Sequence, residues 1–195
     1  MEIVERIKSI LISPQKEWPV IESENAPHMK VFTTYVVLLA VIPALAAFVG
    51  YGLVGYTVLG VHVGSVGWGI RQAVVQYAAM LGGTYITAFV VNAFADGFGA
   101  RKDFDCAFSL VAYAYTPMFV AGVFYLLPSL SWLASLAGLY GLYLLYTGLQ
   151  PLMKVPADKQ TLYFVVSLVA TVVVSAVLSF ILAAILLRGV YSGLF

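Results

Sequence analysis

Three carboxylates lie within ten residues of one another in the segment DGFGARKDFD, at positions 96–105. Asp96, Asp103 and Asp105 surround the bases Arg101 and Lys102, and Asn92 precedes them by one helical turn. Carboxylate and amide oxygens are the ligands that hard cations prefer, so these side chains could gather a cation of unspecified identity or another ligand. The alternative is a solvated loop whose acids pair with its own bases, and the sequence leaves both open.

The other residues capable of chemistry do not form a known catalytic arrangement. His62 and Ser65 are three positions apart, without a recognisable nucleophile turn or an acid to complete a triad. The sequence also lacks a His-Glu-x-x-His motif. We therefore predict neither an enzyme nor a bound cofactor, and the net charge of +1 gives no reason to expect a nucleic-acid partner.

The segments that must position these residues are strongly apolar. Hydrophobic residues make up 62% of the chain and charged residues only 10%, against roughly 25% charged residues in soluble domains. Residues 106–153 form a stretch of 48 residues without Asp, Glu, Lys or Arg. Because about 20 apolar residues cross a bilayer, this stretch alone predicts two spans, joined at Leu127-Pro128-Ser129. The fold class predicted is an all-α membrane protein.

Charged residues divide the chain into five apolar segments, which predict a five-helix transmembrane bundle. The segment Tyr51–Gly69 is rich in Gly and Val, and predicts an irregular or hairpin-like loop. The expected spans are Val31–Gly50, Ala73–Ala95, Ala107–Leu127, Leu130–Leu149 and Leu162–Leu187.

Basic residues are distributed unevenly between the two sides of this topology. Eight of the ten fall in the N-terminal tail and in the loops after spans two and four, while Arg71 and Arg188 fall on the other side. Cytoplasmic flanks retain Lys and Arg, so we expect a cytoplasmic N-terminus and an external or periplasmic C-terminus.

The chain divides into an amphipathic cytoplasmic or interfacial segment, residues 1–30, and a transmembrane domain, residues 31–195. Apolar residues recur in the tail at helical spacing, and Arg6 and Lys8 are expected on the opposite, polar face. The tail is therefore expected to lie along the cytoplasmic membrane surface or on the bundle. Ser13-Pro14 predicts the start of a second short helix, in which Trp18 is expected as an interfacial anchor. The apolar positions are Ile3, Val4, Ile7, Ile10 and Leu11.

Small residues mark helix faces that are expected to pack against other helices. In span four, Gly138, Gly141 and Gly148 form one face. In span five the face comprises Ser167, Thr171, Ser175 and Ser179.

Span two carries two separate polar faces, so it does not predict a continuous polar lane across the membrane. The first holds Gln72, Gln76, Gly83 and Thr87, and the second holds Asn92 and Asp96.

Four stretches together resemble the Yip1 family, in particular its short prokaryotic inner-membrane branch. They are SPQKEWPVI (13–21), FGARKDFDCAF (98–108), AYAYTPMFVAG (112–122) and GLYGLYLLYTGLQP (138–151). The resemblance implies five membrane helices, a cytoplasmic N-terminus and a location in a prokaryotic plasma membrane. Tyr113, Tyr115, Thr116 and Pro117 match a Tyr-Gly-Tyr-Ser-like family motif, with Ala114 in place of the Gly.

Eukaryotic members of the family are linked to vesicle traffic, Rab GTPases and membrane shaping. They carry a longer N-terminal region with an Asp-Leu-x-Gly-Pro motif, which this sequence lacks. The resemblance therefore does not imply a Rab-type GTPase as a partner, and it supplies no catalytic residue.

Two functions follow as hypotheses. The first is a non-enzymatic scaffold that organises lipid or binds other membrane proteins, including further copies of itself. The alternative is a small ion or solute transporter or channel that uses Asn92, Asp96 and Asp103, with Pro117 as a helix break. A proline within a span frees a carbonyl one turn earlier, near Tyr113, and another donor must satisfy that carbonyl.

Overall fold

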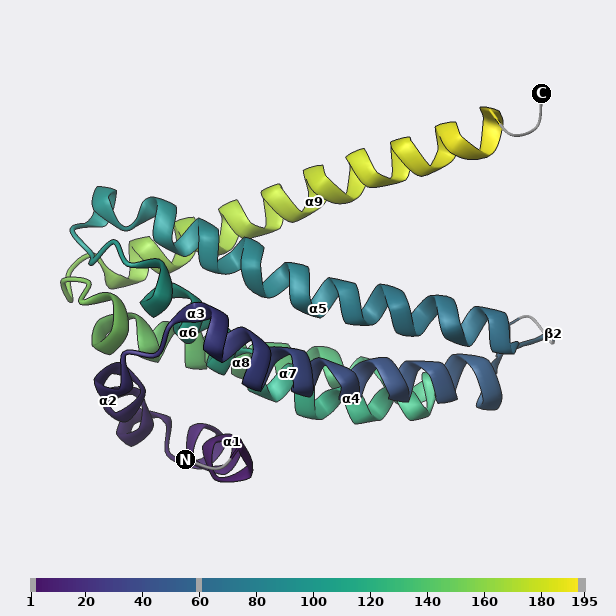
Figure 1. Cartoon of the computed structure of the whole chain (residues 1–195), viewed down its shortest axis with the longest axis horizontal. Helices are drawn as coiled ribbons and strands as arrows, with labels where there is room; N and C mark the ends of the chain where they lie inside the picture. Colours follow the sequence, from purple (N-terminus) through teal and green to yellow (C-terminus); the bar gives the residue numbers. More distant parts are fainter. Residues whose placement is uncertain (1–2, 59–60, 193–195) are drawn as a thin grey trace.

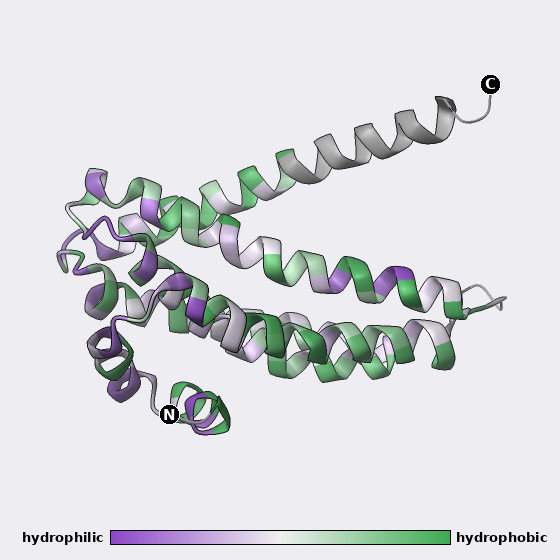
Figure 2. Cartoon of the chain, viewed as in Figure 1, coloured by the Kyte–Doolittle hydropathy of each residue, from purple (hydrophilic) through white to green (hydrophobic). Residues whose placement is uncertain are grey.

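The computed structural model describes residues 3–58 and 61–192, and side chains in the last helix are described up to residue 177. It contains five helical stretches long and apolar enough to span a membrane (Figures 1 and 2), which confirms the predicted all-α membrane fold. These stretches are His28–Val54, Val66–Phe94, Phe104–Leu126, Pro128–Met153 and, within the described side chains, Gln160–Val177.

Two of the five stretches are single helices, and three are composed of several elements. The single helices are α5 (Val66–Phe94) and α9 (Gln160–Ser192). The first stretch combines α3 (His28–Val31), the π-helix η1 (Phe32–Val36), α4 (Val37–Ala47) and the π-helix η2 (Phe48–Val54). The third and fourth comprise α6 (Phe104–Ala114), α7 (Thr116–Ala121) and the 3-10 helix η4 (Gly122–Leu126), then the 3-10 helix η5 (Pro128–Leu130) and α8 (Ser131–Met153).

The helix of the second span extends beyond its predicted apolar segment because a polar residue caps it. The helix α5 begins at Val66 rather than Ala73. At this start the Oγ atom of Ser65 accepts a hydrogen bond from the Trp68 N–H at 3.2 Å. Between the first two spans, β1 (Tyr56–Val58) and β2 (Val61–Val63) form an antiparallel hairpin with Thr57 opposite His62. The predicted hairpin-like loop is therefore confirmed, although it is shorter than expected.

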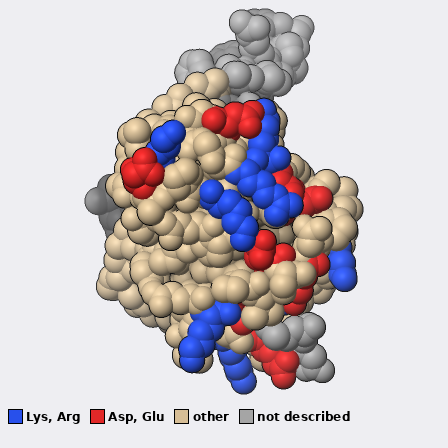
Figure 3. All heavy atoms as spheres, turned by 90° about the vertical axis from the view of Figure 1, so that its left-hand side faces the viewer, with Lys and Arg blue, Asp and Glu red and all other residues tan. Residues whose placement is uncertain are grey.

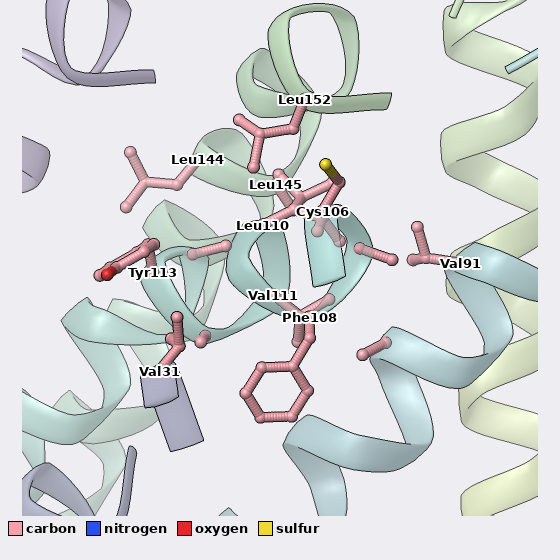
Figure 4. Close-up of a cluster of buried hydrophobic side chains, with 14 of the residues drawn as sticks. Val31, Val91, Cys106, Phe108, Leu110, Val111, Tyr113, Leu144, Leu145 and Leu152 are labelled. Atoms are coloured by element: carbon pink, nitrogen blue, oxygen red, sulfur yellow. The ribbon is translucent and has the colours of Figure 1, made fainter. Parts of the chain in front are cut away.

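The helix α6 lies at the centre of the bundle. Every residue from Cys106 to Ala114 is buried, against α5, α8 and α3. Figure 4 shows its side chains directed toward Val91 of α5, Val31 of α3, and the leucines of α8. A helix whose faces are nearly all apolar is typical of an enclosed position.

The predicted small-residue faces are used unequally within the chain. A Cβ atom at Gly141 would lie 3.0 Å from the Ala114 carbonyl oxygen, whereas one at Gly138 would meet no described atom within 4 Å. In α9, Ser167 is buried, while Thr171 and Ser175 are partly exposed. The side chain of Ser179 lies outside the described residues.

The N-terminal tail forms α1 (Ile3–Ile12) and α2 (Pro14–Glu24), with Pro14 at the predicted first helical position. Two expectations for this tail were wrong. Trp18 is not an interfacial anchor, because its side chain is 1% exposed and its Nε1 donates to the Thr147 Oγ1 of α8 at 3.2 Å. Arg6 does not lie on a solvent-facing surface either, because it is buried, and the tail therefore packs against the bundle.

Charged side chains gather at the end of the molecule that holds the tail and the loops before α6 and α9. Figure 3 looks directly at this charged end, where blue and red atoms lie close together. The opposite end carries the β1–β2 hairpin (Figure 1). The clustering agrees with the grouping of basic residues on one side that the five-span topology predicts.

Candidate functional site

The residues of the Tyr-x-Tyr-Thr-Pro motif lie where the third span is interrupted. The helix α6 ends at Ala114, α7 begins at Thr116, and Tyr115 lies between them. Pro117 has no N–H to donate to the preceding turn. The hydroxyl of Thr116 instead donates to the Tyr113 carbonyl oxygen at 2.6 Å, which confirms that the freed carbonyl finds another donor.

Thr116 also joins this break to the first span. Its Oγ1 lies 2.7 Å from the Tyr35 hydroxyl, and both side chains are buried. A hydroxyl has only one hydrogen, and Thr116 gives its own to the Tyr113 carbonyl. Tyr35 is therefore the donor, and the three groups form a directed chain of hydrogen bonds.

An ionic network from the tail covers the same side of the break. The Arg6 guanidinium lies 5.4 Å from the centre of the Tyr113 ring and forms ion pairs with Glu17 and Glu24. The side chains of Arg6 and Glu17 are only 5% and 9% exposed, so each charge needs the other as compensation. No sequence pattern indicated this network, because the partners lie 11 and 18 residues from Arg6.

A cavity of about 590 Å³ opens beside this network, and we name it the Arg6 pocket. It combines charged, hydroxyl and aromatic groups from α1, α2, the first span and α6. Its polar and aromatic lining comprises Arg6, Glu24, Lys30, Thr34, Tyr35 and Tyr113.

Tyr115 points to the other side of the break, toward α5 and α9. Its hydroxyl lies 2.7 Å from the Thr87 Oγ1, and both groups line a cavity of about 40 Å³ together with Ser167. The Ser167 Oγ atom is buried and has no hydrogen-bond partner among the described residues. The motif thus contacts the first span on one side and α5 on the other, and on that side it shares a cavity with α9.

The acidic residues do not form the cation site considered from the sequence. Asp96 pairs with Lys102 at 2.6 Å, and Asp103 pairs with Arg101 at 2.5 Å. Within the part of the chain that the structure describes, no three His, Cys, Asp or Glu side chains are grouped to hold a metal ion. Asp96 and Asp103 thus pair with the bases of their own loop, as the alternative hypothesis expected.

Asp105 and Asn92 also lie apart from these pairs. Asp105 accepts from the backbone N–H of His28 at 2.7 Å and contacts its Nδ1 at 2.5 Å, a partner that the sequence analysis missed. The Asn92 Oδ1 is buried without a hydrogen-bond partner among the described residues, whereas the side chain of Asp96 is 63% exposed. Asn92 and Asp96 therefore do not form one polar site.

Asp103 has a structural role at the start of α6. Its Oδ1 accepts from the backbone N–H groups of Asp105 and Cys106 at 3.0 and 3.3 Å. This arrangement satisfies two of the donors that a helix N-terminus leaves free. Asp103 therefore fixes the start of the third span as well as pairing with Arg101.

Comparison with known proteins gives relatives of the same class. The inner membrane protein YohC of Escherichia coli strain K12 is 30% identical to this chain over 125 residues, which cover 63% of the chain and 64% of that protein. The YohC of E. coli strain CFT073 matches with the same identity and coverage. The aligned region thus spans slightly less than two thirds of these relatives. No solved structure matches the chain.

The family comparison covers more of the sequence. The Yip1 domain model matches residues 8–189, which include all five candidate spans as far as they are described, the acidic loop and the Tyr113–Pro117 motif. This range also includes α2, whose Trp18 is buried against the bundle. The chain therefore belongs to the Yip1 family.

Proposed function

We propose that this membrane protein is a non-catalytic scaffold that holds a second copy of itself, or another membrane protein, against a face of α5. The face is made of small residues that no described part of the chain covers. Ala78 and Ala79 are exposed, and a Cβ atom at Gly82 or Gly83 would meet no described atom within 4 Å. We name these four residues the small face of α5.

Residue size and spacing support this assignment. Ala78 and Gly82, like Ala79 and Gly83, are separated by four positions, so each pair lies one above the other on the helix. Small residues with this spacing allow another membrane helix to approach closely, where van der Waals contacts favour association. The open small face is the single observation on which the proposal rests.

The interior of the bundle gives the transport hypothesis no comparable support. The central helix α6 is buried from Cys106 to Ala114, and the cavity beside Tyr115 holds about 40 Å³. Two of the three candidate polar groups for transport, Asp96 and Asp103, pair with bases of their own loop, and the third, Asn92, lies apart from them. A scaffold needs no polar route through the bundle, so it accounts for these observations more simply.

We further propose that the protein lies in a prokaryotic inner membrane, with the charged end in the cytoplasm. The relative YohC is described as an inner membrane protein. The basic residues of the tail and of the two loops at the charged end are those that the positive-inside tendency retains in the cytoplasm.

Cysteine crosslinking in native membranes tests the scaffold. An Ala79→Cys variant should form disulfide-linked or reagent-linked species larger than the monomer. The native protein serves as one control, because its only cysteine, Cys106, is buried. A Leu139→Cys variant serves as the second, because Leu139 is 64% exposed on α8, away from the small face. Monomers alone from Ala79→Cys, or equal crosslinking from both variants, would refute the proposed face.

A further inference from the structure

We propose that the Arg6 pocket binds the headgroup of a phospholipid that carries both a phosphate and an ammonium group. The pocket measures about 590 Å³, within the range of roughly 300–1,000 Å³ that small-molecule sites occupy. This assignment is independent of the scaffold proposal, because it involves a different face of the molecule and a different class of partner.

The charges around the pocket sum to zero. Arg6 and Lys30 carry positive charges, and Glu24 and the adjoining Glu17 carry negative ones. Both carboxylates hold the Arg6 guanidinium in place, whereas Lys30 forms no salt bridge within the described part of the chain. Lys30 is therefore the cation best able to bind a phosphate. A zwitterionic headgroup would preserve the balance, while an anionic one would add a net negative charge.

Glu24 supplies the matching group for the ammonium. It contacts Arg6 through Oε1, and its side chain is 37% exposed, in contrast to the nearly enclosed Glu17. A carboxylate has two oxygens and about four acceptor positions, so Glu24 can accept further hydrogen bonds. With phosphate at Lys30 and ammonium at Glu24, both headgroup charges would find a partner in the lining of one cavity.

The surface above the pocket favours a lipid over a soluble molecule with the same headgroup. Lys30 and Thr34 lie at the start of the first span, and both are exposed. Farther along the same span, Leu38 is 55% exposed and Leu45 is 60% exposed. The polar cavity is thus followed along the span by an apolar surface at membrane depth. A phospholipid has the same order, with a polar headgroup followed by apolar acyl chains.

The test measures lipid binding to the whole chain in detergent by native mass spectrometry. Three ligands are compared: phosphatidylethanolamine, phosphatidylglycerol and soluble glycerophosphoethanolamine. The native chain should retain phosphatidylethanolamine in preference to the other two. A Lys30→Gln variant should lose about tenfold in affinity for it, equivalent to about 1.4 kcal/mol. The matched control is Lys16→Gln, since Lys16 is exposed and does not line the pocket.

A second variant tests the ammonium partner. Glu24→Gln should reduce the preference for phosphatidylethanolamine over phosphatidylglycerol, because the neutral amide no longer favours the ammonium group. Far-ultraviolet circular dichroism should show unchanged helix content in all variants. The inference is overturned by equal retention of the two lipids by the native chain, by equal binding of Lys30→Gln and Lys16→Gln, or by soluble headgroup binding as tight as lipid.

Discussion

At the scale of single residues, Thr116 replaces the helical hydrogen bond that Pro117 cannot make. It donates to the Tyr113 carbonyl and accepts from the Tyr35 hydroxyl, so one small side chain connects the break in the third span with the first span. The sequence predicted that a donor was needed near Tyr113. It did not identify Tyr35, because that contact joins residues 81 positions apart.

Removal of the Thr116 hydroxyl should therefore destabilise the bundle. Thr116→Val leaves the Tyr35 hydroxyl and the Tyr113 carbonyl without their partner, and a buried unsatisfied group costs about 1–3 kcal/mol. Thr161→Val is the matched control, because its contact with Tyr146 is exposed. Denaturant titration in mild detergent should show a loss of stability for Thr116→Val alone. Equal stability of the two variants would contradict the role assigned to Thr116.

The Arg6 ion network makes a separate prediction. Arg6→Met retains an apolar stem of similar length but leaves the buried Glu17 carboxylate unpaired, which should cost about 3–5 kcal/mol. Lys102→Met removes the exposed pair with Asp96 and should cost under about 1 kcal/mol. The same unfolding titration measures both. If Arg6→Met loses no more stability than Lys102→Met, the ion network contributes little to the stability of the bundle.

At the scale of helices, the packing of α8 depends on where its glycines meet other elements. A Cβ atom at Gly148 would lie 2.4 Å from the Leu110 Cδ1 and 2.9 Å from the Trp18 Cε2. Gly148 therefore allows both α6 and the tail helix α2 to approach α8. At Gly138 the same addition meets open space within the described chain.

This difference predicts opposite effects for the same substitution at two positions of one helix. Gly148→Ala should destabilise the bundle by about 1–3 kcal/mol through overpacking. Gly138→Ala should be neutral or stabilising by up to about 1 kcal/mol, because alanine favours the helix. Thermal unfolding followed by tryptophan fluorescence compares the two variants. A stability for Gly148→Ala equal to or above that of Gly138→Ala would contradict the close approach of Trp18.

The sequence predicted the helices better than their contacts. Apolar length and the positions of charges located all five spans, and Pro128 marked the turn between spans three and four. The small residues of α8 indicated packing but not which glycine meets a neighbour. Trp18 and Arg6 were misplaced because local amphipathicity does not reveal contacts with residues more than ten positions away.

At the scale of the whole molecule, the gathering of charge at one end predicts its orientation. Thr57 in the hairpin and Lys16 in the tail are both exposed and lie at opposite ends. In intact cells, a membrane-impermeant maleimide should label Thr57→Cys but reach Lys16→Cys only after the cells are opened. The buried Cys106 should remain unlabelled in the native control. The reverse pattern would show that the N-terminus lies outside.

The most direct test of the scaffold is the protein mass of particles extracted from native membranes without detergent and analysed by native mass spectrometry. If the small face holds a partner, the native chain should have a mass above the 21.1 kDa of a monomer. The Gly83→Leu variant should have the mass of a monomer, because the larger side chain blocks the small face. Gly67→Leu, at another open glycine of α5, should leave the assembly intact. A native chain found only as a 21.1 kDa monomer would contradict the scaffold.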